Sequence, residues 1–184
     1  MDKTFTPQRT TLLVLRAQSG DPEAIDQLLE SCQGELFGYL NKMLRNEADA
    51  EDTLQSTLIQ AVKKIGWLRE PSQFRPWIFR IASRNAFHLI RKSQRVNEIS
   101  NFGAVEQAAQ PESAPARQQD LIDQIPKWLE HLRPKGREAI ILHYLKGFTT
   151  EEVANITGIP LGTAKSRISY SLACIRRQIN TNTE

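Results

Sequence analysis

The segment from Phe148 to Ile179 constrains the fold more than any other part of the chain. Its sequence is FTTEEVANITGIPLGTAKSRISYSLACIRRQI. Thr149 is followed three residues later by Glu152, which is the capping-box pattern of a helix start. Gly158 separates this helix from a second one that begins around Pro160, and glycine tolerates the backbone angles of a tight turn between helices. The segment therefore predicts a helix-turn-helix.

The second helix of this motif has an apolar face and a polar, basic face. The apolar face carries Ala164, Ile168, Leu172, Ile175 and Ile179. The other face carries Thr163, Lys165, Ser166, Arg167 and Tyr170, and the chain has no acidic residue from Val153 to Thr183. Arginine can form paired hydrogen bonds with guanine in the major groove, while lysine and serine can hold phosphates. The alternative is a small helical hairpin with a solvated basic face, but the capping box and the glycine turn favour DNA binding.

Helical periodicity extends through most of the remaining chain, without internal repeats or alternating strand patterns. Asp21 before Pro22 predicts one helix start, and the acidic segment 47–52 predicts another. Pro71 predicts a break. The residues expected to face inward are Leu54, Leu58, Ala61, Val62 and Ile65 before this break, and Trp77, Ile78, Ile81, Ala82 and Leu89 after it.

The helical pattern is lost between the two halves of the chain. Residues 96–119 are rich in alanine, glutamine, serine and proline, a composition typical of a flexible linker. We therefore predict an all-α fold of two small helical domains, residues 10–95 and 120–178, joined by this linker. The second domain contains the helix-turn-helix.

Composition and charge exclude several classes of protein. The chain is 40% hydrophobic with a net charge of +3, as expected of an ordinary globular protein with a mild basic excess. It shows no signal peptide and no apolar run long enough to span a membrane, so we expect a cytoplasmic protein. Neither the cysteines, Cys32 and Cys174, nor the histidines, His88, His131 and His143, have metal-ligand or catalytic spacing. We therefore expect no metal, cofactor, small-molecule substrate or enzymatic activity.

A second stretch, FRPWIFRIASRNAFHLIRK, combines large rings with arginines and lacks acids from Pro71 to Asn97. Rings that stack on bases and cations that follow a phosphate backbone are the chemistry of single-strand binding. The alternative places the rings in the core, with Trp77 the foremost candidate, and the arginines in solvent. Taken alone, the stretch favours this alternative. The predicted helix-turn-helix on the same chain makes DNA binding by this stretch the stronger hypothesis.

Together these stretches resemble the extracytoplasmic-function (group IV) sigma factors, the minimal two-domain sigma subunits of bacterial RNA polymerase. RAQSGDPEAIDQLLE is similar to the opening helix of the family, and NEADAEDTLQSTLIQAV to its polymerase-docking segment. FRPWIFRIA resembles the promoter-melting segment. LRPKGREAIILHYLKGFTTEEVANITGIPLGTAKSRISYSLACIR resembles the second DNA-binding domain. The resemblance covers Leu15 to Arg177 apart from the linker.

The resemblance implies a factor that binds RNA polymerase core, at the beta-prime clamp and the beta flap, and directs promoter-specific transcription initiation. It assigns core-polymerase binding to Asp49, Glu51, Asp52 and Gln55. It assigns opening and recognition of the downstream (−10) element to Arg69, Gln73, Phe74, Arg75, Arg80, Arg84, Asn85, His88, Arg91 and Lys92. It assigns recognition of the upstream (−35) element to Thr163, Lys165, Ser166, Arg167 and Tyr170. An anti-sigma factor is a further partner that the resemblance implies.

The sequence departs from the family pattern at three positions. The family usually has an acid where Ser56 stands, asparagine where Arg84 stands and aspartate where His88 stands. These departures concern individual polymerase and downstream-element contacts. A different class also fits the last third of the chain: a helix-turn-helix transcriptional regulator with a helical N-terminal interaction domain. Such a regulator would bind DNA without polymerase and would not need FRPWIFRIA.

Overall fold

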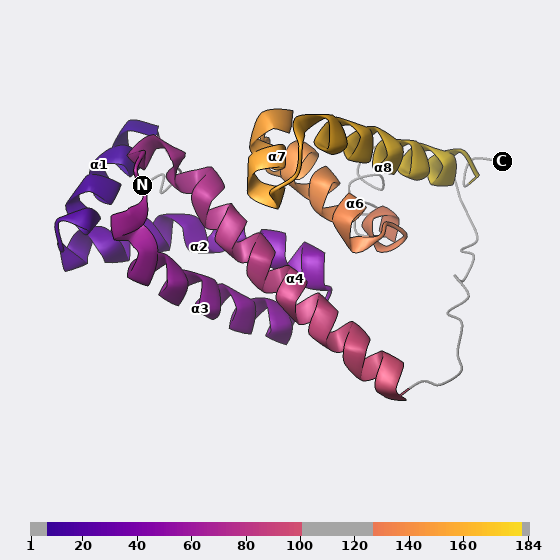
Figure 1. Cartoon of the computed structure of the whole chain (residues 1–184), viewed down its shortest axis with the longest axis horizontal. Coiled ribbons are helices and arrows are strands. Elements are labelled where there is room, and N and C mark those ends of the chain that lie inside the picture. The colour runs from indigo at the N-terminus through magenta and orange to yellow at the C-terminus, as the bar shows by residue number, and fades with distance from the viewer. Residues whose placement is uncertain (1–6, 101–126, 182–184) are drawn as a thin grey trace. The chain divides into compact units, whose positions relative to one another are not determined.

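The computed structural model describes residues 7–100 and 127–181, with side chains described from 8 to 95 and from 127 to 179. In these ranges every regular element is helical, which confirms the predicted all-α class (Figure 1). The described residues fall into two compact units, the first of which consists mainly of residues 7–92. No helix in the described ranges is long and apolar enough to cross a membrane.

The first unit contains four α-helices and two short 3-10 turns. They are α1 (Pro7–Gln18), α2 (Pro22–Leu44), α3 (Glu47–Lys64), η1 (Ile65–Trp67), η2 (Pro71–Gln73) and α4 (Phe74–Ser100). The predicted helix start at Asp21 is confirmed, because its carboxylate accepts a 3.2 Å hydrogen bond from the backbone N–H of Ala24. Asn46 caps α3 in the same way, accepting 3.0 Å from the N–H of Asp49. The predicted break at Pro71 lies at η2, between α3 and α4.

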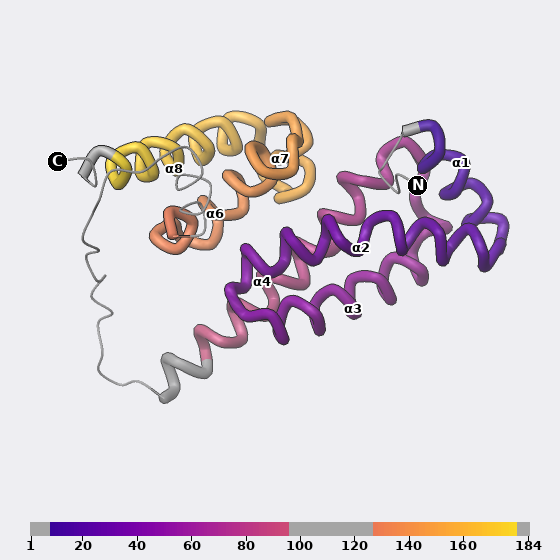
Figure 2. Tube along the Cα trace, turned by 180° about the vertical axis from the view of Figure 1, so that it is seen from behind, coloured from indigo at the N-terminus to yellow at the C-terminus, as the bar shows by residue number. Residues whose placement is uncertain are grey.

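Side chains from α4 connect it to α2, and a side chain from α1 holds the loop before α4. The rings of Tyr39 and Phe79 meet edge to face with centroids 5.3 Å apart. Gln18 on α1 donates hydrogen bonds to the carbonyls of Ile65 at 3.0 Å and Leu68 at 2.7 Å. Figures 1 and 2 show α2, α3 and α4 running side by side in views from opposite sides. The result is a small helical bundle around one buried core.

The inward face of α3 differs from the predicted one. Ala61 and, in η1, Ile65 are buried as expected, Leu54 and Leu58 are half-buried, and Val62 is exposed. The other buried residues of α3 are Ala50, Thr53 and Thr57. Threonine can lie inside because its hydroxyl finds a partner on its own helix: Thr57 Oγ1 donates to the Thr53 carbonyl at 2.7 Å. The apolar pattern alone therefore placed the buried stripe partly on the wrong side of the helix.

Helix α4 continues beyond the predicted domain end at Arg95 and reaches Ser100. No glycine or proline occurs between Pro76 and Gly103, so no residue in that interval breaks the helix. The loss of apolar periodicity marks the end of core packing rather than the end of the helix. Residues 101–119 of the predicted linker, and the predicted helical residues 120–126, lie outside the described residues.

The described part of the second unit begins with helical residues 127–130 and continues with three short elements and a long helix. These are α6 (Pro134–Ile140), the π-helical turn η3 (Ile141–Leu145), α7 (Thr150–Thr157) and α8 (Leu161–Thr181). The predicted capping box is confirmed: Glu152 N–H donates to Thr149 Oγ1 at 3.2 Å, and Thr149 N–H donates to Glu152 Oε2 at 2.8 Å. Gly158 has φ +69°, the left-handed conformation that ends α7 and permits the predicted turn.

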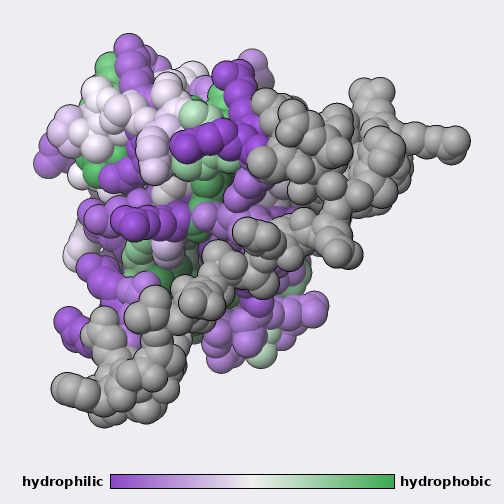
Figure 3. Space-filling view, turned by 90° about the vertical axis from the view of Figure 1, so that its right-hand side faces the viewer, coloured by the Kyte–Doolittle hydropathy of each residue, from purple (hydrophilic) through white to green (hydrophobic). Residues whose placement is uncertain are grey.

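The surface in Figure 3 is mostly hydrophilic, with hydrophobic residues showing in small areas among the polar ones. A small number of large hydrophobic side chains are exposed in the described residues. In the first unit they are Leu12, Leu15, Ile59, Val62 and Trp67, and in the second Tyr144, Leu161 and Tyr170. These residues are the starting point for locating surfaces that meet a partner.

Buried Arg137 holds the start of the second unit together. Its guanidinium donates to the carbonyls of Leu129 at 2.9 Å and Leu132 at 3.2 Å. We expect Arg137→Lys to lower the free energy of unfolding of this unit by about 2–4 kcal/mol, because a single ammonium cannot replace the planar fork and leaves a buried carbonyl unpaired. Urea unfolding of this variant and of Arg133→Lys, at an exposed position nearby, measures the difference. Equal stability of the two variants would contradict this role.

The two cysteines should differ sharply in reactivity. Cys32 is completely buried in the first unit, and this burial raises the pKa of its thiol from 9.0 to about 12. We expect iodoacetamide at about pH 8 to modify half-buried Cys174 in the folded protein and to spare Cys32, because only the thiolate reacts. Mass spectrometry of the labelled peptides, with a urea-unfolded sample as control, measures this. Equal native labelling of both thiols would refute it.

The same shift gives a pH dependence of stability. The folded state keeps the Cys32 proton at pH values where the unfolded state loses it, so the contribution is present below pH 9.0 and is lost as pH rises toward about 12. Cys32→Ala should remove this component of the alkaline loss of stability.

Candidate functional site

The helix-turn-helix presents the polar face of α8 outward. Ala164, Ile168 and Ile175 are buried, which turns the opposite side of the helix to solvent. Exposed on that opposite side are Thr163, Ser166 and Tyr170, spaced three and four residues apart, and Tyr170 is 69% exposed.

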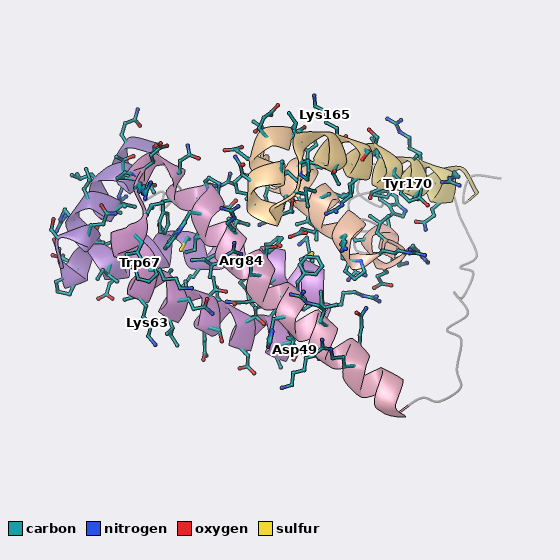
Figure 4. All side chains as sticks on the ribbon, in the orientation of Figure 1. Asp49, Lys63, Trp67, Arg84, Lys165 and Tyr170 are labelled. Atoms are coloured by element: carbon teal, nitrogen blue, oxygen red, sulfur yellow. The ribbon has the colours of Figure 1, made fainter. Side chains whose placement is uncertain are left out.

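Two cations border this stripe. Lys165 is exposed and Arg167 is half-buried, and by helical spacing they lie on either side of the stripe. Figure 4 shows Lys165 extending away from α8. All five residues predicted for the upstream element therefore lie on the outward part of α8, where a groove of DNA could reach them.

Several cations of α4 lie along one side of the helix. Arg84, His88, Arg91 and Lys92 are exposed and Arg80 is half-buried. Spacings of four, four and three residues from Arg80 to Arg91 place them along one side of the helix. Arg69 and Gln73, in the loop before α4, are exposed as well. These residues bring cations and one histidine together in a region without a carboxylate between Pro71 and Asn97.

The aromatic rings at the start of α4 pack in the core of the first unit. Phe74 and Phe79 are both 0% exposed, and Trp77 is half-buried against Phe74, with centroids 5.8 Å apart. A ring without exposed surface cannot stack on a base, so Phe74 is removed from the predicted DNA contacts. The physical reason is that Phe74 is the first residue of α4 and lies on the inward face of this helix. Burying its ring there gives a hydrophobic gain that exposure to solvent would forgo.

Two further predicted DNA contacts are engaged inside the first unit. Asn85 Nδ2 donates to Thr57 Oγ1 at 3.1 Å, and its Oδ1 accepts from Gln60 Nε2 at 3.0 Å. Arg75 forms an ion pair with Glu35 and lies over the ring of Phe79, 5.7 Å from its centroid. These two side chains therefore fasten α4 to α3 and α2, and a DNA contact would compete with those bonds.

The predicted polymerase-binding residues lie on the first half of α3. Glu51, Asp52 and Gln55 are exposed, Asp49 is half-buried, and Figure 4 shows Asp49 at the end of α3 opposite Lys63. The acidic surface continues along the helix into exposed Ile59 and Val62. This apolar continuation was missed from the sequence because Val62 was assigned to the core. Among the described residues there is no group of histidine, cysteine, aspartate or glutamate that could hold a metal ion.

Comparison with known families matches both units. Residues 28–96 match Sigma-70 region 2, and residues 122–175 match Sigma-70 region 4. The RNA polymerase sigma factor CarQ of Myxococcus xanthus is 30% identical over 155 residues, covering 83% of this chain and 87% of CarQ. The ECF RNA polymerase sigma-E factor of Salmonella typhimurium is 30% identical over 190 residues, covering 97% of each chain. The chain belongs to the ECF sigma factors.

Solved structures agree with this assignment. The sigma factor RpoE from Bartonella quintana, in complex with the anti-sigma factor NepR, is 28% identical with a TM-score of 0.68, covering 84% of this chain and 96% of RpoE. CnrH, solved with the cytosolic domain of CnrY, has a TM-score of 0.70 at 22% identity. The match covers 95% of this chain and 99% of CnrH, and it supports the fold.

The family assignment establishes what the protein does as a whole. A sigma factor is a transcription initiation factor rather than a catalyst, and its regions 2 and 4 bind RNA polymerase core and promoter DNA. This sigma factor thus directs RNA polymerase to promoters, as the resemblance of its sequence implied. The helix-turn-helix lies in the part of the chain matched by region 4.

Proposed function

We propose that this sigma factor divides its contacts among three helices, with polymerase on α3, the downstream element on α4 and the upstream element on α8. The observation that carries this proposal is the separation of charge. The first half of α3 displays carboxylates, whereas the outward surfaces of α4 and α8 display cations in acid-free segments. DNA is a polyanion, so it is attracted to the second kind of surface and repelled by the first.

On α3, the contact with core polymerase uses Asp52 and Gln55 with Asp49 and Glu51 at the helix start. The exposed side chains of Ile59 and Val62 extend this surface with an apolar part. An interface with an apolar centre and charges at its rim gains affinity from burial and orientation from charge. Because Ser56 stands where the family usually has an acid, this surface has one carboxylate fewer than is usual in the family. We assign it to the beta-prime clamp.

On α4 and the preceding loop, the downstream element is contacted by a reduced set of residues. It comprises Arg69, Gln73, Arg80, Arg84, His88, Arg91 and Lys92. Arg75 and Asn85 position α4 through Glu35 and Thr57 rather than meeting DNA. Arg84 and His88, which depart from the family pattern, are exposed on this surface and are therefore placed to alter the preferred downstream sequence.

On α8, the upstream element is contacted in the major groove. The first two turns of the helix carry Thr163, Lys165, Ser166 and Arg167, and Tyr170 follows one turn later. Arg167 is suited to a guanine edge, and Lys165 to a phosphate. The same unit is assigned to the beta flap of polymerase.

Regulation and location follow from the partner. The related RpoE was solved with the anti-sigma factor NepR. An anti-sigma factor for this chain would block the same charged and apolar surfaces that polymerase needs. A factor that joins bacterial RNA polymerase acts in the cytoplasm, and it needs no cofactor or catalytic group of its own.

The test is transcription by purified sigma-free core polymerase on a pooled genomic template, with and without this protein. Sequence-selective starts that require the protein would support the proposed function and would identify its promoter elements. If no starts appear and the protein alone binds DNA tightly, the helix-turn-helix regulator becomes the better account. In that case the acidic face of α3 needs another partner.

A further inference from the structure

Trp67 is the most exposed large hydrophobic residue in the described part of the chain, at 79% exposure. It is the last residue of η1, directly before the loop of Arg69 and Gln73. Tryptophan is highly buried on average, and exposing nearly the whole indole forgoes the hydrophobic gain of burial. A ring displayed in this way needs a physical explanation that folding alone does not supply.

The backbone beneath Trp67 is fixed on both sides. Ile65 and Leu68 are buried, and their carbonyls both accept hydrogen bonds from the side chain of Gln18, at 3.0 Å and 2.7 Å. The N–H of Leu68 also donates to the Ile65 carbonyl at 3.1 Å. The indole therefore projects from a turn whose backbone is held by hydrogen bonds, and not from an unconstrained loop. A fixed platform loses little conformational entropy when it binds a flat partner.

The charges around Trp67 select the kind of partner. Exposed Lys63 and Lys64 precede it on the last turn of α3, and exposed Arg69 follows it. Glu70 is the only acid in the sequence between Asp52 and Glu98. Figure 4 shows Lys63 and Trp67 both at the end of α3 opposite Asp49. An exposed ring among three cations is complementary to a nucleic acid strand.

The alternative occupant is the polymerase surface that meets the rest of α3. That surface is expected to complement carboxylates, so it would be repelled by Lys63 and Lys64. The charge along α3 thus changes sign between the acidic first half and the basic end that carries Trp67. This change favours DNA at the basic end.

We propose that Trp67 is a stacking residue for a base of the melted downstream element, with Lys63, Lys64 and Arg69 holding the strand beside it. This inference rests on the proposed function. It replaces buried Phe74 with an exposed ring on the other side of the same loop. It also extends the DNA surface of the first unit beyond α4 to the end of α3.

The experiment compares Trp67→Ala, Trp67→Phe and the control Leu12→Ala, each assembled with core polymerase. Leu12 is exposed on α1 and belongs to none of the proposed surfaces. The probes are two forms of one promoter taken from the transcription experiment: a fork with a single-stranded downstream non-template strand, and the fully paired duplex. Fluorescence anisotropy gives the affinity for each probe, and a separate titration gives the affinity for core polymerase.

We expect Trp67→Ala to weaken fork binding by about 5- to 100-fold, as loss of one base–aromatic stack does. Trp67→Phe should recover most of this loss, while polymerase affinity and duplex binding stay unchanged. Fork binding by Trp67→Ala equal to that of wild type would overturn the proposal. Loss of polymerase affinity would overturn it as well and would place Trp67 in the docking surface. Failure of the wild-type protein to initiate at any promoter would instead overturn the proposed function itself.

Discussion

Replacing both Asp49 and Asp52 with lysine is expected to abolish association with core polymerase, weakening it by more than about 100-fold. Like charges placed against each other across an interface cost several kcal/mol, and about 1.4 kcal/mol is a factor of ten in affinity. The expected loss is large because both carboxylates of the proposed docking surface become cations, which a polymerase surface complementary to carboxylates would repel. Anisotropy of the labelled sigma factor, titrated with core polymerase, measures it.

Two controls separate docking from folding. Asp49 lies in the first turn of α3, where a cation opposes the helix dipole, so the double variant also tests the helix start. Asp52→Lys alone lies beyond that turn and should still lose at least about 10-fold in affinity for polymerase. Asp26→Lys, which reverses an exposed acid on α2, is the matched control and should bind as wild type does. If association survives in the double variant and promoter preference changes instead, the docking face is misplaced.

Local signals in the sequence were sufficient for the helix starts and for the turn of the helix-turn-helix. Asp21, the Thr149–Glu152 capping box and Gly158 all take the roles that their chemistry predicts. Each role depends on hydrogen bonds or backbone angles within a few residues, so tertiary contacts have little opportunity to override it. The polar face of α8 followed for the same reason, since one strongly amphipathic helix fixes its own outward side.

Choices among several apolar residues could not be made from the sequence. Phe74 and Trp67 are both large rings within two residues of an arginine, yet Phe74 is 0% exposed and Trp67 is 79% exposed. Which ring is buried depends on how α4 meets α2 through Phe79 and Tyr39, and on how Gln18 pins the turn at η1. These contacts join residues far apart in the sequence, so no local pattern contains them.

The same limit applies to polar residues inside the first unit. Thr57 and Asn85 are separated by 28 positions and bond to each other between α3 and α4. A hydrogen-bonded polar pair is as compatible with the interior as an apolar one, because neither group is left unpaired. The resemblance to the family placed Asn85 on DNA, and a resemblance in sequence does not contain the contact with Thr57 that engages this side chain inside the unit.

Replacing Lys165 and Arg167 with alanine is expected to weaken binding of the assembled polymerase to upstream-element duplex by at least about 10-fold. A bidentate arginine–guanine contact is worth about 1–3 kcal/mol, and the lysine adds a phosphate contact. The variant should also show a salt dependence that is shallower by about one charge, because one phosphate contact is lost. Affinity for core polymerase should not change, because we assign these side chains to the DNA groove and not to the proposed contacts with the clamp or the flap.

Arg176→Ala with Arg177→Ala is the matched control, because it removes two cations from the later turns of the same helix. If DNA attraction were only a matter of net charge, this control would weaken binding as much as the Lys165 and Arg167 variant does. Recognition in a groove predicts otherwise, since only the first turns of α8 would approach base edges. Equal losses of DNA affinity in the two variants would therefore show that α8 attracts DNA only through its positive charge. Loss of polymerase binding would show that this face of α8 contacts polymerase instead of DNA. A loss confined to the Lys165 and Arg167 variant would locate sequence recognition at the start of α8.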